Sequence, residues 1–566
     1  MSSAVEVLPG PLARTRALGI DRERAVGLAL LAAALVVGLA TAADYGITID
    51  EFNANDYGSK ALAWYTSGFT DRSHFETVEF SLWYYGPWFQ MLTAAVQSLG
   101  LAHPLTIRHA LTFLVGLAGI ATLYPMARLS FGRWAGPAAI AICLATGYLY
   151  GNLFFAPIDV PFLATMCWAT VGIMAMARTV VPTWPATICT GAAMGLAIAT
   201  RTGGIITHAY LFGALVLCAL KAVAASGWAA RGTVLRVALR GAAAIATAWV
   251  VAIALWPWLQ IGNPFAQFKI AYSYFAAIPT DFEFDHWGRR VLTTDLPWSY
   301  IPEQWFARFP IGFLALLATA MLLGLDAARR WLRLAIAGWR RAGSAGLHEA
   351  ALTIARSRNM LVVWVAAVAP VGFLMVTHAT FYDGVRHTLF VIPMLALPAG
   401  WALVRLAQAL GRARIVAAMI GLAYAGGLVA NLAVLHPLEY IATNAFAGGT
   451  AGSYGRFELD YWSAAATEAL RRLESRLDQA GAFSRGAPGI LICIPYREYM
   501  TRVMVSPKWR IELDPDKADF VIESQRARCA EGKPALALTD EVKRYDQPFA
   551  WTYVNKASPY GETAPP

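Results

Sequence analysis

The sequence places acidic and basic side chains beside long apolar segments, and these residue types could together carry out group transfer. The acidic candidates are the adjacent pair Asp50 and Glu51, and Asp159 between two prolines. The basic candidates are Arg108, Arg201, Arg386 and His387. A partly buried carboxylate binds protons more tightly, as a general base requires, and arginine offers a planar fork of donors that matches phosphate. The set predicts proton removal by a carboxylate next to a cationic phosphate site.

The chemistry that this set permits is displacement at a sugar carbon. A carboxylate takes the proton from an acceptor hydroxyl, while arginines stabilise the phosphate that departs from the other face of the carbon. A single displacement inverts the anomeric carbon, by analogy with inverting glycosidases, which use a base and form no covalent intermediate. No nucleotide-sugar motif is needed, because a lipid phosphate can carry the sugar.

Each candidate also has a structural interpretation. An aspartate beside proline, such as Asp159, commonly caps a helix or forms a turn, and the Asp50–Glu51 pair could lie in a solvated loop. An arginine near a membrane boundary can extend its side chain to the lipid headgroups. We favour the functional interpretation because Ile49 and Phe52 flank the acidic pair and because the basic positions all fall at one membrane face.

The elements that must position these residues are apolar blocks that a bilayer would bury. The chain has 566 residues, of which 57% are hydrophobic and 14% are charged. This balance excludes a soluble enzyme and a disordered protein. Much of the net charge of +10 lies in short gaps between the apolar blocks. That distribution is the positive-inside pattern of a multi-span membrane protein, and we expect no nucleic-acid partner.

We predict eleven membrane spans within residues 25–435, after a cytoplasmic segment at residues 1–24. The first apolar run is too long for a typical signal peptide, so we expect it to remain as an uncleaved span. The spans are Ala25–Ala43, Thr106–Ala127, Trp134–Tyr150, Val160–Met176, Trp184–Thr200, Ile205–Leu220, Gly241–Trp258, Phe309–Leu325, Met360–His378, Thr388–Val404 and Ile415–Leu435. Basic residues gather in alternate loops, which places the N-terminus inside and residues 436–566 outside.

Two long loops are then expected on the outer face. They are Asp44–Leu105, which is acidic and aromatic, and Leu259–Arg308. Within the first loop, Tyr84–Leu101 carries interfacial aromatic residues, and a twelfth crossing there would break the agreement between the spans and the charges. We interpret this block as an amphipathic helix on the outer membrane surface.

The C-terminal region, residues 436–566, is expected to contain a small α/β module. Tyr461–Gln479 has helical spacing, and Gly489–Ile494 and Ala518–Ile522 are typical of short buried strands. If this region lies in an oxidising compartment, a disulfide between Cys493 and Cys529 is expected. The other cysteines lie in apolar blocks and are interpreted as small core residues: Cys143, Cys167, Cys189 and Cys218.

In their order, these features resemble the GT-C class of membrane glycosyltransferases, and within it glycosyltransferase family 39. That family includes protein O-mannosyltransferases and aminoarabinose transferases that act on lipid A. The resemblance covers roughly residues 26–435 and rests on the following positions: Asp50–Glu51 in the first loop, Tyr84–Trp88 followed by Arg108, Asp159 in the second outer loop, Arg201–Gly203, and Arg386–Pro393. The family's His-Pro-Pro-Leu stretch is Tyr85-Gly86-Pro87-Trp88 here, which puts donor or acceptor preference in doubt.

The resemblance implies an all-α GT-C fold of about eleven transmembrane helices with juxtamembrane helices in the first outer loop. It implies a polyprenyl-phosphate sugar donor, a glycan, lipid or protein acceptor outside the cytoplasm, and a place in the inner (plasma) membrane. We expect no cofactor, and nothing in the sequence requires a divalent ion, because the spacing of Asp281, Glu283, Asp285 and His286 is not diagnostic of a metal site. The alternative is a transporter or flippase, but its charges would line a path across the bilayer, whereas these gather at one face.

Overall fold

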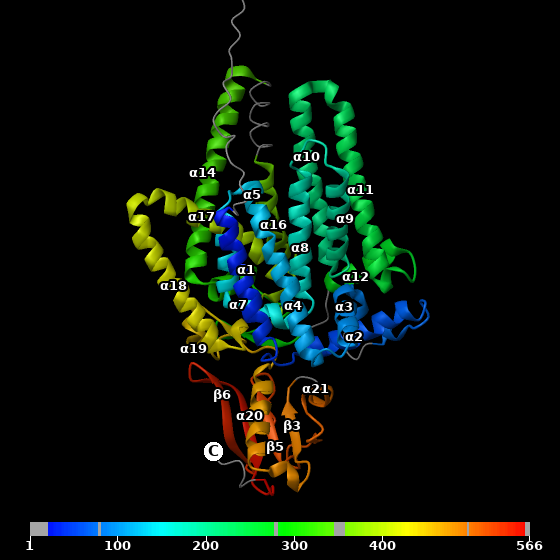
Figure 1. The fold of residues 1–566 in the computed structure, drawn as a ribbon, viewed down its shortest axis with the longest axis vertical. Coiled ribbons are helices and arrows are strands. Elements are labelled where there is room, and N and C mark those ends of the chain that lie inside the picture. Colours follow the sequence, from blue (N-terminus) through cyan, green and yellow to red (C-terminus); the bar gives the residue numbers. More distant parts are fainter. Residues whose placement is uncertain (1–20, 77–80, 277–280, 344–356, 495–496, 561–566) are drawn as a thin grey trace, which may run out of the picture.

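The computed structural model describes residues 21–76, 81–276, 281–343, 357–494 and 497–560. Figure 1 shows a bundle of long helices with a smaller module, which contains a β-sheet, at one end of the bundle. The last bundle helix ends at Leu435, and the chain enters the module from there.

Among the described residues, nine helices are long and apolar enough to cross a membrane. They are α1 (Arg22–Thr41), α4 with α5 (Pro104–Ala121 and Leu123–Ser130), α8 (Asp159–Met176), α10 (Ile206–Ser226), α11 (Arg231–Leu255), α14 (Ile311–Ala342), α16 (Arg358–Val376), η6 with α17 (Arg386–Val391 and Ile392–Ala409) and α18 (Arg414–Leu435). Large apolar side chains such as Val36, Leu322 and Leu422 are exposed on them, as is typical where lipid surrounds a helix. The chain is a multi-pass membrane protein.

The two remaining predicted spans take other forms. Residues 134–150 fall on α6 (Ala135–Ala145) and α7 (Gly147–Phe155), which are bent by 73° at the break between them. Residues 184–200 fall on α9 (Trp184–Ile198), an apolar helix of 15 residues. The predicted apolar segments are therefore all helical, but residues 134–150 form a broken helix because Thr146 is extended.

Two glycines of α7 let the chain that follows α18 pack directly against it. A Cβ at Gly147 would lie 2.8 Å from the Cβ of Ala442, and a Cβ at Gly151 would lie 2.4 Å from the backbone nitrogen of Tyr440. Any side chain at these two positions would push the η8 segment (Glu439–Ile441) away. The close approach places the start of the C-terminal region directly against α7.

Short elements cover the end of the bundle that faces the module. The first loop forms α2 (Ile49–Thr66), the single-turn η1 (Ser73–Phe75) and η2 (Leu82–Tyr84), and α3 (Trp88–Gln97). Figure 1 shows α2 and α3 at this end of the bundle, which agrees with the surface helix predicted at residues 84–101. The later loop forms α12 (Pro264–Ala276), the antiparallel hairpin β1–β2 (Glu283–His286 and Arg289–Leu292) and α13 (Tyr300–Arg308).

The module is the small α/β unit that the sequence predicts. Its sheet has the order β4-β3-β5-β7-β6, with β3 parallel to β4 and β5 and the other pairs antiparallel. The strands are β3 (Gly489–Cys493), β4 (Arg510–Ile511), β5 (Phe520–Ser524), β6 (Leu536–Arg544) and β7 (Gln547–Asn555). Helix α20 (Ala465–Gln479) packs on the sheet, and α21 (Arg497–Met504) follows β3.

The cysteines follow the predictions with one exception. Cys493 and Cys529 form a disulfide within the module. Cys143, Cys167 and Cys218 are buried, as expected of core residues. The interpretation of Cys189 as a core residue is wrong, because α9 turns this side chain outward and leaves it exposed.

Candidate active site

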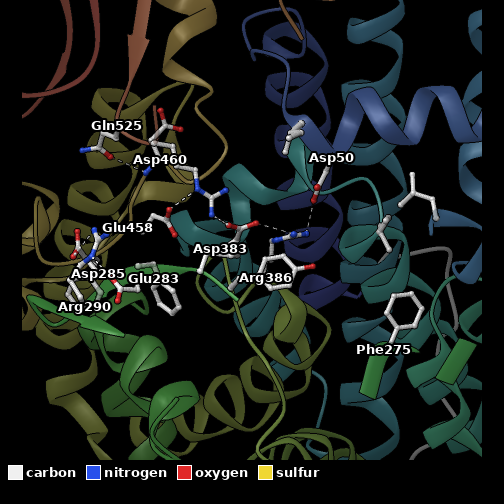
Figure 2. A pocket seen from close by; sticks show the side chains of 18 of the residues that line it. Asp50, Phe275, Glu283, Asp285, Arg290, Asp383, Arg386, Glu458, Asp460 and Gln525 are labelled. Carbon is white, nitrogen blue, oxygen red and sulfur yellow. Dashed lines mark hydrogen bonds and ion pairs between the residues drawn. The ribbon is translucent and has the colours of Figure 1, made fainter. Parts of the chain in front are cut away.

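A cavity of about 740 Å³ lies where the helical bundle meets the module. Its wall combines the start of α2, the chain just before η6, the β1–β2 hairpin and a loop of the module that follows β5. Figure 2 shows Asp50, Arg386 and Asp383 side by side across this cavity, with dashed lines joining them. The charged residues that line the cavity are Asp50, Arg201, Glu283, Asp285, Arg290, Asp383, Arg386, Glu458, Asp460, Arg526 and Arg528.

Asp50 occupies the first turn of α2 and lines the cavity. The helix starts there because the Thr48 side chain accepts a hydrogen bond from the Glu51 backbone and the Glu51 side chain accepts one from the Thr48 backbone. The Asp50 Oδ2 atom lies 2.8 Å from Nη1 of Arg386. Burial raises the pKa of Asp50 above 3.8, and the positive charge of Arg386 opposes part of that rise.

Glu51 points away from the cavity although it is the next residue. Its carboxylate is fully buried, with Oε1 2.9 Å from Nε2 of His109 and Oε2 accepting hydrogen bonds from both the backbone and the hydroxyl of Thr48. The two adjacent carboxylates therefore point in different directions, and only that of Asp50 lines the cavity. The Glu51 carboxylate contacts the helix start and His109, and its role as a base stays a prediction.

Arg386 lies at the centre of the charged groups. Its Nη1 atom is 2.9 Å from Oδ2 of Asp159 as well as in contact with Asp50, and its Nη2 atom is 3.1 Å from Oδ2 of Asp383. The second oxygen of Asp159 accepts a hydrogen bond from Arg201. The Nε atom of Arg386 is buried and has no hydrogen-bond partner among the described residues. Arg386 also lines the cavity, where its positive charge is suited to an anionic ligand.

Arg201 lies on the edge of the cavity, beside an aromatic ring. Its guanidinium carbon is 5.6 Å from the centre of the Tyr85 ring, and both residues line the cavity. The predicted residues Asp50, Asp159, Arg201 and Arg386 are thus brought together, although they lie on α2, α8, the turn after α9 and η6.

Arg108 and His387 are the two predicted phosphate ligands that lie outside the cavity wall. Arg108 is fully buried in α4, with Nε 2.8 Å from Oδ1 of Asn55 and Nη1 2.7 Å from Oε1 of Gln90. It therefore ties α4 to the surface helices and does not line the cavity. His387 also lies outside the cavity wall, and its ring contacts the rings of Phe381 and Tyr382. Neither residue lines the cavity, and their role as phosphate ligands stays a prediction.

Sequence reasoning missed the part of the cavity that the module supplies. Arg526 has Nη2 2.6 Å from Oδ1 of Asp383 and Nε 2.8 Å from Oε1 of Glu458. Burial raises the pKa of Glu458, and it raises that of Asp460 to about 7. Arg526 and Asp383 are 143 residues apart in the chain. No motif marks Arg526, and its closeness to Cys529 is the one signal that could have drawn attention to it.

The described ranges contain no group of three or more His, Cys, Asp or Glu side chains that could hold a metal ion. The acidic residues of the β1–β2 hairpin are instead engaged in local contacts. Arg290 lies 3.5 Å from Glu283 and 3.8 Å from Asp285, and His286 lies 2.8 Å from Glu303.

The arrangement of helices and module is similar to that of ArnT from Cupriavidus metallidurans. The ArnT structure bound to undecaprenyl phosphate matches with a TM-score of 0.50 and 15% identity, over 95% of this chain and 99% of that one. Its apo state matches with a TM-score of 0.50 and 16% identity, over 96% and 100% of the two chains. The chain has the GT-C fold.

A more remote likeness, with a TM-score of 0.42 and 12% identity, is to the archaeal oligosaccharyltransferase AglB from Archaeoglobus fulgidus, over 88% of this chain and 69% of that one. No family model and no curated protein matches the chain by sequence. The resemblance to the GT-C class is confirmed at the level of fold, while the narrower assignment to family 39 stays a prediction.

Proposed function

We propose that this GT-C protein is an integral-membrane glycosyltransferase that transfers a sugar from a polyprenyl-phosphate donor to an acceptor. The observation that carries the proposal is the contact of Asp50 with Arg386 in one cavity at the end of the bundle. A carboxylate suited to proton removal thereby lies next to a cation suited to phosphate. The solved ArnT structure of this fold is bound to undecaprenyl phosphate, which supports the same donor class here.

In the proposed reaction, Asp50 takes the proton from an acceptor hydroxyl as its oxygen forms a bond to the anomeric carbon of the donor. The bond from that carbon to the phosphate oxygen breaks, and the electron pair leaves with the polyprenyl phosphate. Arg386 and Arg201 stabilise the charge that develops on this phosphate. One displacement of this kind inverts the anomeric carbon.

The contact between Asp50 and Arg386 implies an order in which donor and acceptor bind. A phosphate that binds Arg386 competes with Asp50 for the same guanidinium, because both are anions. Donor binding would therefore release Asp50 from its ion pair and leave its carboxylate able to accept a proton. The order of events would be donor first and acceptor second.

We further propose that the cavity and the module face the extracytoplasmic side of the inner (plasma) membrane. The acceptor would then be a glycan, lipid or protein in that compartment. The transporter alternative is less well supported, because the charged residues of the cavity lie at one end of the bundle and form no path along it.

The direct test is Asp50→Asn in purified protein, with a panel of polyprenyl-phosphate sugars and release of polyprenyl phosphate as the readout. We expect the rate to fall at least about a hundredfold, because the base is lost. Binding of polyprenyl phosphate should persist or tighten, because the asparagine no longer competes for Arg386. A structural defect would weaken binding as well.

Asp56→Asn is the matched control, since Asp56 also lies on α2 but pairs with Lys60 and does not line the cavity. Transfer at the wild-type rate by Asp50→Asn would rule out Asp50 as the base. Failure of the wild-type protein to release polyprenyl phosphate from any donor would favour the transporter alternative.

A further inference from the structure

The module contributes a loop, residues 525–528, that forms part of the cavity wall. Gln525, Arg526 and Arg528 of this loop all line the cavity. The loop leaves strand β5, which is paired with β3 on one side and with β7 on the other. It ends at Cys529, whose disulfide partner Cys493 is the last residue of β3. Both ends of the loop are therefore fixed to the same sheet.

Arg526 is held by protein groups on each of its nitrogens. In addition to its ion pairs with Asp383 and Glu458, its Nη1 atom donates a hydrogen bond of 2.7 Å to the backbone oxygen of Tyr461. The guanidinium carbon also lies 5.4 Å from the centre of the Phe282 ring. A guanidinium with this set of partners has one orientation, so Arg526 is suited to hold another group in place and not to bind a ligand itself.

The group that Arg526 holds is Asp383, which in turn contacts Arg386. One carboxylate oxygen of Asp383 faces Arg526 and the other faces Arg386. The Asp383 backbone has a φ of +56°, in the left-handed region that non-glycine residues rarely adopt. Such a conformation persists where the surroundings determine it, and Arg526 is one of the groups that does so.

We propose that Arg526 is a positioning residue, which holds Asp383 and thereby fixes the guanidinium of Arg386 at the cavity wall for the donor phosphate, and that the Cys493–Cys529 disulfide holds the loop that carries it. This inference rests on the proposed function and deepens it. The donor site would then be assembled from both parts of the molecule, and the bundle alone would be incomplete. Donor binding would also depend on formation of the disulfide.

The test measures binding of polyprenyl phosphate to the purified full-length protein in lipid nanodiscs. We expect Arg526→Ala to bind about tenfold more weakly, the loss typical of a charge-assisted contact that orients a ligand group. Arg510→Ala is the control, because Arg510 lies in the same module but pairs with Glu512 and Asp519 outside the cavity. Equal binding by Arg526→Ala and wild type would overturn the inference.

Two further variants separate positioning from other roles. In an Asp383→Asn background, Arg526→Ala should cause no further loss, because its effect passes through Asp383. A full additional loss would mean that Arg526 contacts the ligand independently. Arg526→Lys should bind more weakly than wild type, since one ammonium cannot reach the partners of a guanidinium. Wild-type affinity in Arg526→Lys would show that charge alone suffices.

The disulfide is tested by replacing both of its cysteines with serine. We expect polyprenyl phosphate binding to weaken several-fold, and Arg526→Ala to add little in this variant, because the loop is already displaced. Unchanged binding would overturn the role given to the disulfide. If the wild-type protein itself does not bind polyprenyl phosphate, the proposed function fails; if it binds and the Arg526 variants bind equally well, the inference alone fails.

Discussion

Glu51 holds in place the first turn of α2, which carries Asp50. Successive residues of an α-helix point about 100° apart, and of Asp50 and Glu51 at the start of α2 only Asp50 lines the cavity. Glu51 turns inward to His109, whose Nδ1 atom lies 3.0 Å from the backbone oxygen of Ala42 at the end of α1. Because a carbonyl oxygen accepts hydrogen bonds only, Nδ1 carries a proton, and Nε2 faces the Glu51 carboxyl group. The contact anchors the first turn of α2 to two helices of the bundle.

We expect Glu51→Ala to lower the free energy of unfolding by about 1–3 kcal/mol, because it removes both the cap at Thr48 and the buried contact with His109. The midpoint of thermal unfolding in detergent measures this loss. Asp50→Asn should shift that midpoint much less, since Asp50 is at the cavity wall. A Glu51→Ala protein that unfolds at the wild-type temperature would contradict the supporting role.

At the residue scale, the sequence predicted the members of the site that lie next to apolar segments. Asp50, Asp159, Arg201 and Arg386 could be found because a charge at the end of a membrane span is unusual. The direction of each side chain could not be found in this way, and Arg108 shows why. Its position in the sequence resembles that of Arg386, but its guanidinium turns to Asn55 and Gln90.

At the scale of elements, the segment before α3 contacts the turn after α9 at a position where only glycine fits. A Cβ at Gly86 would lie 1.7 Å from the backbone oxygen of Ala199. The neighbouring residue Tyr85 lies over Arg201, and the indole of Trp88 donates a hydrogen bond of 2.6 Å to Thr200. This contact therefore sets the distance between the surface helices and Arg201.

We expect Gly86→Ala to force these segments apart, to destabilise the protein by about 1–3 kcal/mol and to reduce transfer by separating Tyr85 from Arg201. Thermal unfolding and donor turnover measure the two effects. Gly213→Ala in α10 is the control, because a Cβ there would meet no atom within 4 Å. Equal activity of the two variants would show that the contact is dispensable.

The elements themselves were largely predictable, since apolar segments of the length of a bilayer form helices wherever they occur. The break at Thr146 was not predictable, because it lies within an apolar segment, beside the contacts of Gly147 and Gly151 with residues 439–442, which are distant in the sequence. The position of the loop that carries Arg526 could not be predicted either. Its contact with Asp383 exists only once the module has docked on the bundle.

At the scale of the whole molecule, basic residues of α14 lie at one end of the bundle, and the module is attached to the other end. Arg329, Arg330, Arg333 and Arg340 lie in the second half of α14, whose C-terminal end is far from the module in Figure 1. The module is fixed to the other end by Arg544, which donates hydrogen bonds to the backbone oxygens of Leu435 and His436. Basic residues are retained on the cytoplasmic side of a membrane, so the cavity and module should face the opposite side.

This orientation predicts the outcome of cysteine labelling in intact cells. Arg485→Cys, at an exposed position of the module, should react with a membrane-impermeant maleimide without permeabilisation, whereas Arg333→Cys should react only after it. Both substitutions are made in a Cys189→Ala chain, because Cys189 is an exposed free thiol. The reverse pattern would place the cavity in the cytoplasm. The Cys493–Cys529 pair would then lie in a reducing compartment, where disulfides rarely persist. Donor binding could then not depend on that disulfide.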